Sequence, residues 1–262
     1  MTQKILILIP ARFKSSRFPG KPLYPLLGKT LVDWVYDHFA HFAEDYFKIL
    51  GEKIEAKTFV VTDDERIEMH LRLQQRNVLR VDDDVPSGTE RIAIAYDRFL
   101  KTENADLILN VQGDEPLLMA SDVVDLIQKH LSSQTEMGTL ARPMDGMGEE
   151  FYDPNKVKVV FSQVNHQALY FSRAPIPYLR DKNSENILDF KWYHHIGVYS
   201  FKPDALEKLS HMPLSKLENL EKLEQLRALE AGMKIVVGIT HKALQGVDHL
   251  HDIKAVEDLL KN

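Results

Sequence analysis

The feature that most constrains the fold is an alternation of short apolar runs with longer segments of helical length. The apolar runs lie at residues 5–9, 58–62, 106–111, 157–161, 195–201 and 234–238. Between them, and after the last, lie segments with helical length or periodicity, at residues 30–43, 65–76, 90–100, 121–131, 214–231 and 253–260. Because strands that alternate with helices form parallel sheets, we predict an α/β fold with a mainly parallel central sheet flanked by helices.

Residues 214–231 form the longest predicted helix. Leucine recurs at every third position from Leu217 to Leu226, and Gly232 follows as a C-terminal cap, so we expect one helix whose leucines pack into the core. Residues 44–56 and 177–191 are irregular, and the second stretch is either a mobile loop over a site or a solvated surface loop. We expect one domain, residues 1–262, with a smaller subregion for dimerisation.

Composition narrows the class of protein. A chain of 262 residues with 44% hydrophobic residues can bury a sizeable core, which excludes collagen, low-complexity disorder and a transmembrane bundle. The net charge of −6 leaves no basic footprint for nucleic acid. The first apolar run is too short to span a membrane and lacks a small-residue cleavage site, so no membrane partner is expected. The absence of cysteine excludes disulfides and thiolate metal sites, and it fits a cytoplasmic location.

A basic loop directly follows the first predicted strand. Arg12, Lys14, Arg17 and Lys21 fall within ten residues there, and prolines at positions 10, 19 and 22 stiffen the segment. Ligands of open α/β sheets bind beyond the carboxyl ends of strands. Fixed cations and backbone N–H groups at that place suit a polyphosphate, although an ordinary basic surface loop would have a similar composition.

Two carboxylates follow other strand-like segments. Asp114 lies in the sequence NVQGDEP, and Asp248 lies in GVD. Carboxylate oxygens at such positions suit Mg²⁺, which shares its oxygen ligands with phosphates. A simple turn is the alternative for Gly113–Asp114. Together with a triphosphate, the two carboxylates would form a site for phosphoryl or nucleotidyl transfer.

Nine segments spread over nearly the whole chain carry a family resemblance: IPARFKSSRFPGKPL, VVTDDERI, SGTERIA, NVQGDEPLL, DPNKVKVV, YFSRAPIPY, HHIGVYSF, LEKLEQLRALEAGMKI and GVD. On these segments the chain resembles the 3-deoxy-manno-octulosonate (Kdo) cytidylyltransferases, and the resemblance implies a Rossmann-like nucleotidyltransferase fold. The first loop and GDEP are shared with related sugar nucleotidyltransferases, including the CMP-sialate enzymes, whereas YFSRAPIP, HIGVY and LEQLR point to the Kdo branch. The chain departs from the family at Val85–Pro86 and after Asp248, which leaves room for the 8-amino-3,8-dideoxy analogue of Kdo as substrate.

The resemblance implies that the chain activates an eight-carbon sugar acid with CTP for lipopolysaccharide biosynthesis, releases pyrophosphate, and forms a homodimer. It implies Arg12, Lys21, Asp114 and Asp248 as catalytic residues, with Mg²⁺ held by Asp114 and Asp248. It assigns the nucleotide to Arg12, Ser15, Arg17, Lys21, Ser87, Gly88, Thr89 and Arg91. It assigns the sugar acid to Gln112, Arg173, His195, Glu224 and Gln225.

The residues alone leave alternatives open. His195 could be a core histidine, Arg173 could pair with a local acid, and Glu224 could pair with Lys222 or Arg227. A CMP-sialate-type or other sugar nucleotidyltransferase is the alternative within the class. A catalytically inactive, nucleotide-binding regulatory module is the alternative outside it.

Overall fold

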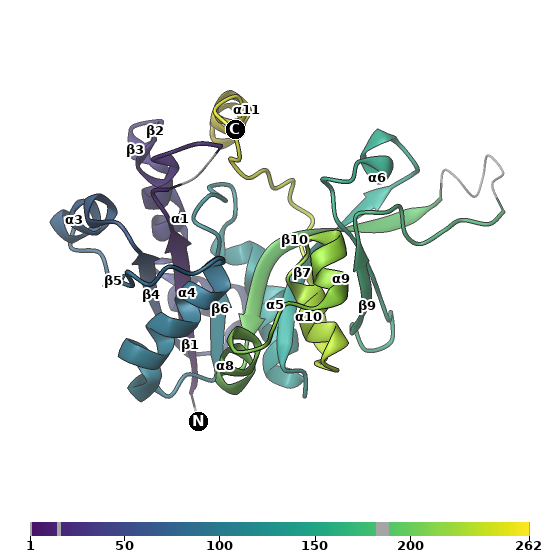
Figure 1. Ribbon diagram of the computed structural model, residues 1–262, viewed down its shortest axis with the longest axis horizontal. Coiled ribbons are helices and arrows are strands. Elements are labelled where there is room, and N and C mark those ends of the chain that lie inside the picture. The colour runs from purple at the N-terminus through teal and green to yellow at the C-terminus, as the bar shows by residue number, and fades with distance from the viewer. Residues whose placement is uncertain (1, 15–16, 182–188, 262) are drawn as a thin grey trace. The chain divides into compact units, whose positions relative to one another are not determined.

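A computed structural model describes residues 2–14, 17–181 and 189–261 (Figure 1). The chain forms two compact units, which are described separately. Unit 1 comprises Met1–Val124 and Ala243–Asn262, and unit 2 comprises Asp125–Lys242. The boundary falls within helix α5 (Ala120–Ser132). In the described residues, no helix is both long enough and apolar enough to cross a membrane.

Unit 1 is built on parallel strands. Its strands are β1 (Gln3–Ala11), β4 (Ile54–Thr62), β5 (Val78–Arg80) and β6 (Leu107–Asn110). Strand β1 pairs in parallel with both β4 and β6, and β4 pairs in parallel with β5. Residues 5–9 of β1 are buried because β1 lies between two neighbours. The carboxyl ends of these strands therefore meet at one edge of the sheet.

Helices cover the strands of unit 1, and one predicted helix is in fact two. The helices are α1 (Leu31–Phe39), α2 (Phe42–Leu50), α3 (Glu65–Leu73), α4 (Gly88–Ala95) and α11 (Asp252–Leu260). The prediction of one helix over 30–43 and an irregular stretch over 44–56 was wrong. His41 leaves the helical conformation, α2 restarts at Phe42, and β4 already begins at residue 54. This restart lets Phe42 and Tyr46 join Phe39 in the core.

Smaller elements complete unit 1. A short hairpin of β2 (Pro25–Leu26) and β3 (Lys29–Thr30) precedes α1. The 3₁₀ turns Lys21–Leu23 (η1) and Lys101–Glu103 (η3) and the π-helical turn Tyr96–Leu100 (η2) lie in the connections. Thr30 begins α1 with a capping box, in which its hydroxyl accepts from the Asp33 N–H and the Asp33 carboxylate accepts from the Thr30 N–H.

Unit 2 has both parallel and antiparallel pairs. Its strands are β7 (Met137–Asp145), β8 (Lys158–Phe161), β9 (Ala168–Ser172), β10 (Lys191–Phe201) and β11 (Ile235–Ile239). Strand β7 pairs in parallel with β11 and antiparallel with β10, while β8 and β9 form an antiparallel pair. Its other helices are α6 (Glu149–Tyr152), α8 (Pro203–Ser210), α9 (Lys216–Glu221) and α10 (Gln225–Glu230). Part of the predicted irregular stretch 177–191 lies outside the described residues.

The predicted helix over 214–231 was also wrong, because it is broken into α9 and α10. Lys222 adopts the left-handed conformation, with a φ of 53°, and ends α9. A spacing of three residues turns about 60° per step around an α-helix, so leucines at that spacing cannot stay on one face. After the break Leu223 and Leu226 are buried, whereas Leu220 is 72% exposed.

The fold class itself was predicted correctly. Each of the six apolar runs overlaps a strand, and helices flank a sheet that is mainly parallel. Strands β5, β7 and β9 were not predicted. The prediction of a single domain over residues 1–262 stays a prediction.

Candidate active site

A pocket of about 360 Å³ lies in unit 1 beyond the carboxyl ends of β1 and β6. Most of its lining comes from the three segments that the sequence singled out, the basic loop after β1, the GDEP segment after β6 and the GVD segment near the C-terminus. Seven of the predicted site residues line it: Arg12, Arg17, Lys21, Gly88, Gln112, Asp114 and Asp248. The predicted phosphate ligand Ser15 lies outside the described residues.

Lys21 ties these segments together. Its ammonium donates to Asp114 Oδ2 at 2.5 Å and to the carbonyl oxygen of Val247 at 2.6 Å. The N–H of Val247 in turn donates to the carbonyl of Asp114 at 2.9 Å. Because the Lys21 side chain is only 13% exposed, these charge-assisted bonds are shielded from water.

The second predicted metal ligand also faces a cation of the basic loop. Arg17 Nη2 lies 3.2 Å from Asp248 Oδ1, and both side chains are 60% exposed. An ion pair this exposed contributes little stability, so it can exchange readily for a ligand. Each predicted metal carboxylate is therefore paired with a cation of the basic loop.

Glu115, which the sequence analysis missed, follows Asp114 and is half-buried. Removal of its carboxyl group from water and the charges of Asp114 and Asp248 together raise its pKa to about 8, and Lys21 opposes the shift. A Cβ atom at Gly246 would lie 2.7 Å from Glu115 Oε1, so glycine is needed for that close approach. The raised pKa favours the neutral form of Glu115 at neutral pH.

The donor set of the pocket fits a hard divalent cation. Both carboxylates line the same pocket and both act on the charge of Glu115. Across the described ranges, no cluster of three or more His, Asp or Glu side chains is arranged to hold a metal. Mg²⁺ is typically bound by one or two protein carboxylates, while phosphate and water oxygens complete its coordination shell.

The predicted nucleotide-binding residues at the start of α4 differ in their contacts. Gly88 lines the pocket. Ser87 caps α4, where its hydroxyl accepts from the N–H of Glu90 at 3.1 Å. Thr89 is buried and accepts from Asn110 Nδ2 at 3.2 Å. The structure thus gives Ser87 and Thr89 a role in holding the start of α4 beside the pocket.

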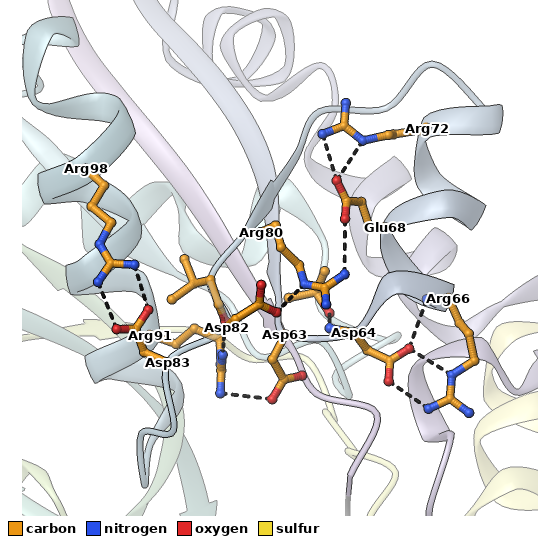
Figure 2. Close-up of polar contacts among 12 residues, drawn as sticks. Asp63, Asp64, Arg66, Glu68, Arg72, Arg80, Asp82, Asp83, Arg91 and Arg98 are labelled. Atoms are coloured by element: carbon orange, nitrogen blue, oxygen red, sulfur yellow. Dashed lines mark hydrogen bonds and ion pairs between the residues drawn. The ribbon is translucent and has the colours of Figure 1, made fainter.

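Arg91, also predicted to bind the nucleotide, is a buried tie between elements. It is 2% exposed, pairs with Asp63 at 3.0 Å and donates to the carbonyl of Val81 at 2.5 Å (Figure 2). Burial lowers the pKa of Arg91, and Asp63 opposes that shift. Arg12 makes a comparable tie, since its Nη1 donates to the carbonyl of Pro86 at 3.2 Å and so links the basic loop to the loop before α4.

Among the residues predicted for the sugar acid, Gln112 belongs to unit 1 and the other four to unit 2. The guanidinium of Arg173 donates to three backbone carbonyls, those of Glu221 (2.6 Å), Pro154 (2.9 Å) and Lys222 (3.5 Å). The carboxylate of Glu221 also lies beside Arg173, but its Oε2 accepts from the backbone N–H of Arg173. The arginine side chain is therefore held in a carbonyl cradle.

His195 and Gln225 are buried in unit 2. His195 Nε2 lies 2.9 Å from Thr139 Oγ1, and burial lowers its pKa to about 3, so its ring is neutral. Tyr199, which the sequence analysis missed, donates to Gln225 Oε1 at 2.9 Å. Within the described residues, the Gln225 Nε2 has no hydrogen-bond partner although it is buried. Glu224 is the residue directly before α10.

The fold and the pocket together define a class. In unit 1 a cationic loop follows the first parallel strand, and the carboxylates of Asp114 and Asp248 line the same pocket. Such a site is expected of a protein that binds a nucleoside triphosphate. The chain matches the model of the cytidylyltransferase family over residues 6–235 and belongs to that family. The predicted family and enzyme class are thus confirmed.

Relatives with established names place the chain more closely. A 3-deoxy-manno-octulosonate cytidylyltransferase from Thermodesulfovibrio yellowstonii is 37% identical over 260 residues, 97% of each chain. An 8-amino-3,8-dideoxy-manno-octulosonate cytidylyltransferase from Shewanella frigidimarina is 40% identical over 257 residues, also 97% of each. The solved structure of a CMP:2-keto-3-deoxy-manno-octonic acid synthetase complexed with CTP superposes with a TM-score of 0.84 at 34% identity, covering 99% of both chains.

Proposed function

We propose that this chain transfers the cytidylyl group of CTP to 3-deoxy-manno-octulosonate or to its 8-amino-3,8-dideoxy analogue. The anomeric 2-hydroxyl attacks the α-phosphorus, the bond to the bridging oxygen of the β-phosphate breaks, and pyrophosphate leaves. The hydroxyl proton passes to solvent. The observation that supports this reaction most is the pocket that brings together Arg12, Arg17 and Lys21 with two carboxylates.

The cations of the pocket have distinct roles in this proposal. The triphosphate is assigned to Arg12, Ser15, Arg17 and Lys21. Arg12 and Lys21 neutralise the charge that develops on the reacting phosphoryl group and on the pyrophosphate, because fixed cations need no reorganisation as that charge appears. Asp114 and Asp248 would hold Mg²⁺, which when bound would neutralise phosphate charge and acidify the attacking hydroxyl.

The sugar acid is assigned to Gln112, Arg173, His195, Glu224 and Gln225. The buried Nε2 of Gln225 supports this assignment, because an unsatisfied donor of that kind suits a hydroxyl of the sugar. The neutral ring of His195 suits a hydroxyl as well. The guanidinium of Arg173 already donates to backbone carbonyls. In this proposal it binds the sugar carboxylate through the N–H groups that these carbonyls do not use.

The test is pyrophosphate release with CTP and Mg²⁺, measured separately with Kdo, with its 8-amino analogue and with N-acetylneuraminate. Turnover with one of the first two acids supports the proposal, and the ratio of their kcat/KM values identifies the substrate. Turnover with N-acetylneuraminate alone would place the chain among CMP-sialate-type enzymes. Tight CTP binding with no turnover on any acid would favour a regulatory module.

We also propose a homodimer located in the cytoplasm. The family resemblance supports the dimer, and Phe99 and Tyr152 are large exposed apolar side chains in the middle third of the chain. The CTP requirement supports the location. Sedimentation equilibrium tests the dimer, which a monomer at micromolar concentration would contradict, and cell fractionation tests the location.

A further inference from the structure

Phe13 forms the neck of the basic loop in unit 1. Its carbonyl accepts from the N–H of Gly20 at 2.9 Å, which holds Phe13 and Gly20 together. The far end of its ring faces Gly20 so closely that a Cβ atom there would lie 3.0 Å from Phe13 Cζ. Gly20 has a φ of 74°, so both its conformation and its neighbour require glycine.

Arg66, at the start of α3, covers the ring of Phe13. Its guanidinium carbon lies 3.3 Å from the ring centroid, within the range of a cation–π contact. The guanidinium is held in place by a fork to Asp64, with Nε donating at 2.9 Å and Nη2 at 2.7 Å (Figure 2). Asp64 itself is fixed, because it caps α3 by accepting the backbone N–H of Arg66.

These contacts connect α3 to the pocket without placing Arg66 in it. Arg66 is absent from the pocket lining, whereas Arg12 and Lys14, the neighbours of Phe13, and Lys21, the neighbour of Gly20, all line it. An exposed Arg–Asp pair by itself contributes little. Here, however, the pair holds a flat cation against the aromatic ring at the neck of the loop.

We propose that Arg66 is a positioning residue that acts through Phe13 to pre-order the basic loop for the triphosphate of CTP. The proposal rests on the proposed function. Its physical content is that a loop whose two ends are already held together loses less conformational entropy when the ligand binds. Lysine cannot replace Arg66 fully, because an ammonium neither forks to a carboxylate nor stacks flat on a ring.

The test compares Arg66→Ala and Arg66→Lys with a matched control, Arg72→Ala. Arg72 lies on the same helix, is similarly exposed and pairs with Glu68, so its removal also breaks an Arg–carboxylate pair (Figure 2). Hydrogen exchange of the Gly20 amide is measured first, in the ligand-free proteins. We expect faster exchange in both Arg66 variants and no change in Arg72→Ala.

CTP affinity is then measured by calorimetry. We expect Arg66→Ala to weaken CTP binding about three- to tenfold, Arg66→Lys to weaken it less than Arg66→Ala does, and the KM for the sugar acid to stay unchanged. In a Phe13→Leu background the Arg66→Ala change should lose most of its effect, because the ring that it acts through is gone.

Unchanged Gly20 exchange, or unchanged CTP affinity in Arg66→Ala, would overturn the proposal. An equal loss of CTP and sugar-acid affinity would also overturn it, because it would indicate general destabilisation. If the wild-type protein itself fails to bind CTP, the proposed function falls, and the exchange comparison alone decides whether Arg66 orders the loop.

Discussion

Lys21 makes two contacts with residues far away along the chain. Its ammonium donates to a carboxylate oxygen of Asp114 and to the carbonyl of Val247, two groups more than ninety positions away. A residue that both ties the pocket together and neutralises phosphate charge should affect folding and chemistry at once. The two effects can be measured independently.

We predict that Lys21→Ala lowers kcat/KM by about 10²- to 10³-fold, because one preorganised charge contact at a transition state contributes that much. The same change should destabilise the fold by about 1–3 kcal/mol, since it leaves a buried carbonyl and a carboxylate without their donor. Turnover and urea unfolding measure the two effects. Lys29→Ala, which removes an exposed lysine paired with Asp37, is the control. A turnover loss below threefold would contradict the role given to Lys21.

Asp114 and Asp248 should differ in what their removal does. Asn in place of either carboxylate should raise the Mg²⁺ concentration needed for half-maximal turnover by at least about tenfold, because a neutral amide is a weaker ligand for a hard cation. Asp114→Asn should also weaken folding, whereas Asp248→Asn should not, since the Arg17–Asp248 pair is exposed. Asp97→Asn, at an exposed i,i+4 pair with Lys101, controls for lost surface charge. An unchanged Mg²⁺ requirement in both variants would rule out their assignment as ligands.

Among the secondary-structure elements, the break between α9 and α10 carries a conformational cost. Lys222 sits there with a φ of 53°, a conformation that costs a non-glycine residue about 1–2 kcal/mol. We therefore predict that Lys222→Gly leaves the free energy of unfolding unchanged or raises it by up to about 1 kcal/mol, after the greater entropy of glycine in the unfolded chain is subtracted. In a continuous helix the same change would lower stability by about 1 kcal/mol, so the sign of the change in urea unfolding decides between the two.

The strands that could be predicted from the sequence are those with long runs of buried side chains. Strand β1 was found because its side chains are buried from Ile5 onward, and its residues 5–9 form an unbroken apolar run. Strand β7 was missed because Thr139, Arg142 and Pro143 interrupt its apolar residues, and it is recognisable only once β10 and β11 lie beside it.

The candidate site was predictable in part for a similar reason. The basic loop follows β1 and Asp114 follows β6, so the fold class alone brings them to one edge. Asp248 lies in the connection between β11 and α11, and the fold class does not place it. The contacts between Phe13 and Arg66, and between Tyr199 and Gln225, join residues far apart along the chain, and no local pattern marks them. For Arg91, the family resemblance suggested a nucleotide ligand, and its burial and its contacts with Asp63 and Val81 reveal a structural tie.

For the molecule as a whole, buried histidines predict acid sensitivity. His130 is buried in unit 2, with Nδ1 2.7 Å from Ser200 Oγ and Nε2 3.2 Å from the Thr135 carbonyl. Burial lowers its pKa to about 4, while the ordinary value is 6.5. As the pH falls, the His130 ring of the unfolded chain therefore takes up a proton at a higher pH than the ring of the folded chain does. The stability that comes from the neutral ring is complete above pH 6.5 and is lost as the pH falls towards 4.

We predict that His130 contributes up to about 1.4 kcal/mol per pH unit to the fall in stability between pH 6 and pH 4.5. Urea unfolding at several pH values should show a shallower fall in His130→Gln. His41→Gln removes an exposed imidazole and serves as the control. In the intact protein, the NMR signal of the His130 ring should stay in its neutral position down to pH 5. A signal that titrates near pH 6.5 would contradict the prediction.

Unit 1 is assembled from both ends of the chain, with Lys21 bonded to the carbonyl of a residue 226 positions later. During synthesis, the basic loop therefore leaves the ribosome long before Asp248 and the Val247 carbonyl do. Until residues 247 and 248 have emerged, a nascent chain cannot complete the pocket. A chain cut short before residue 247 would lack both the carbonyl that Lys21 binds and the carboxylate that pairs with Arg17.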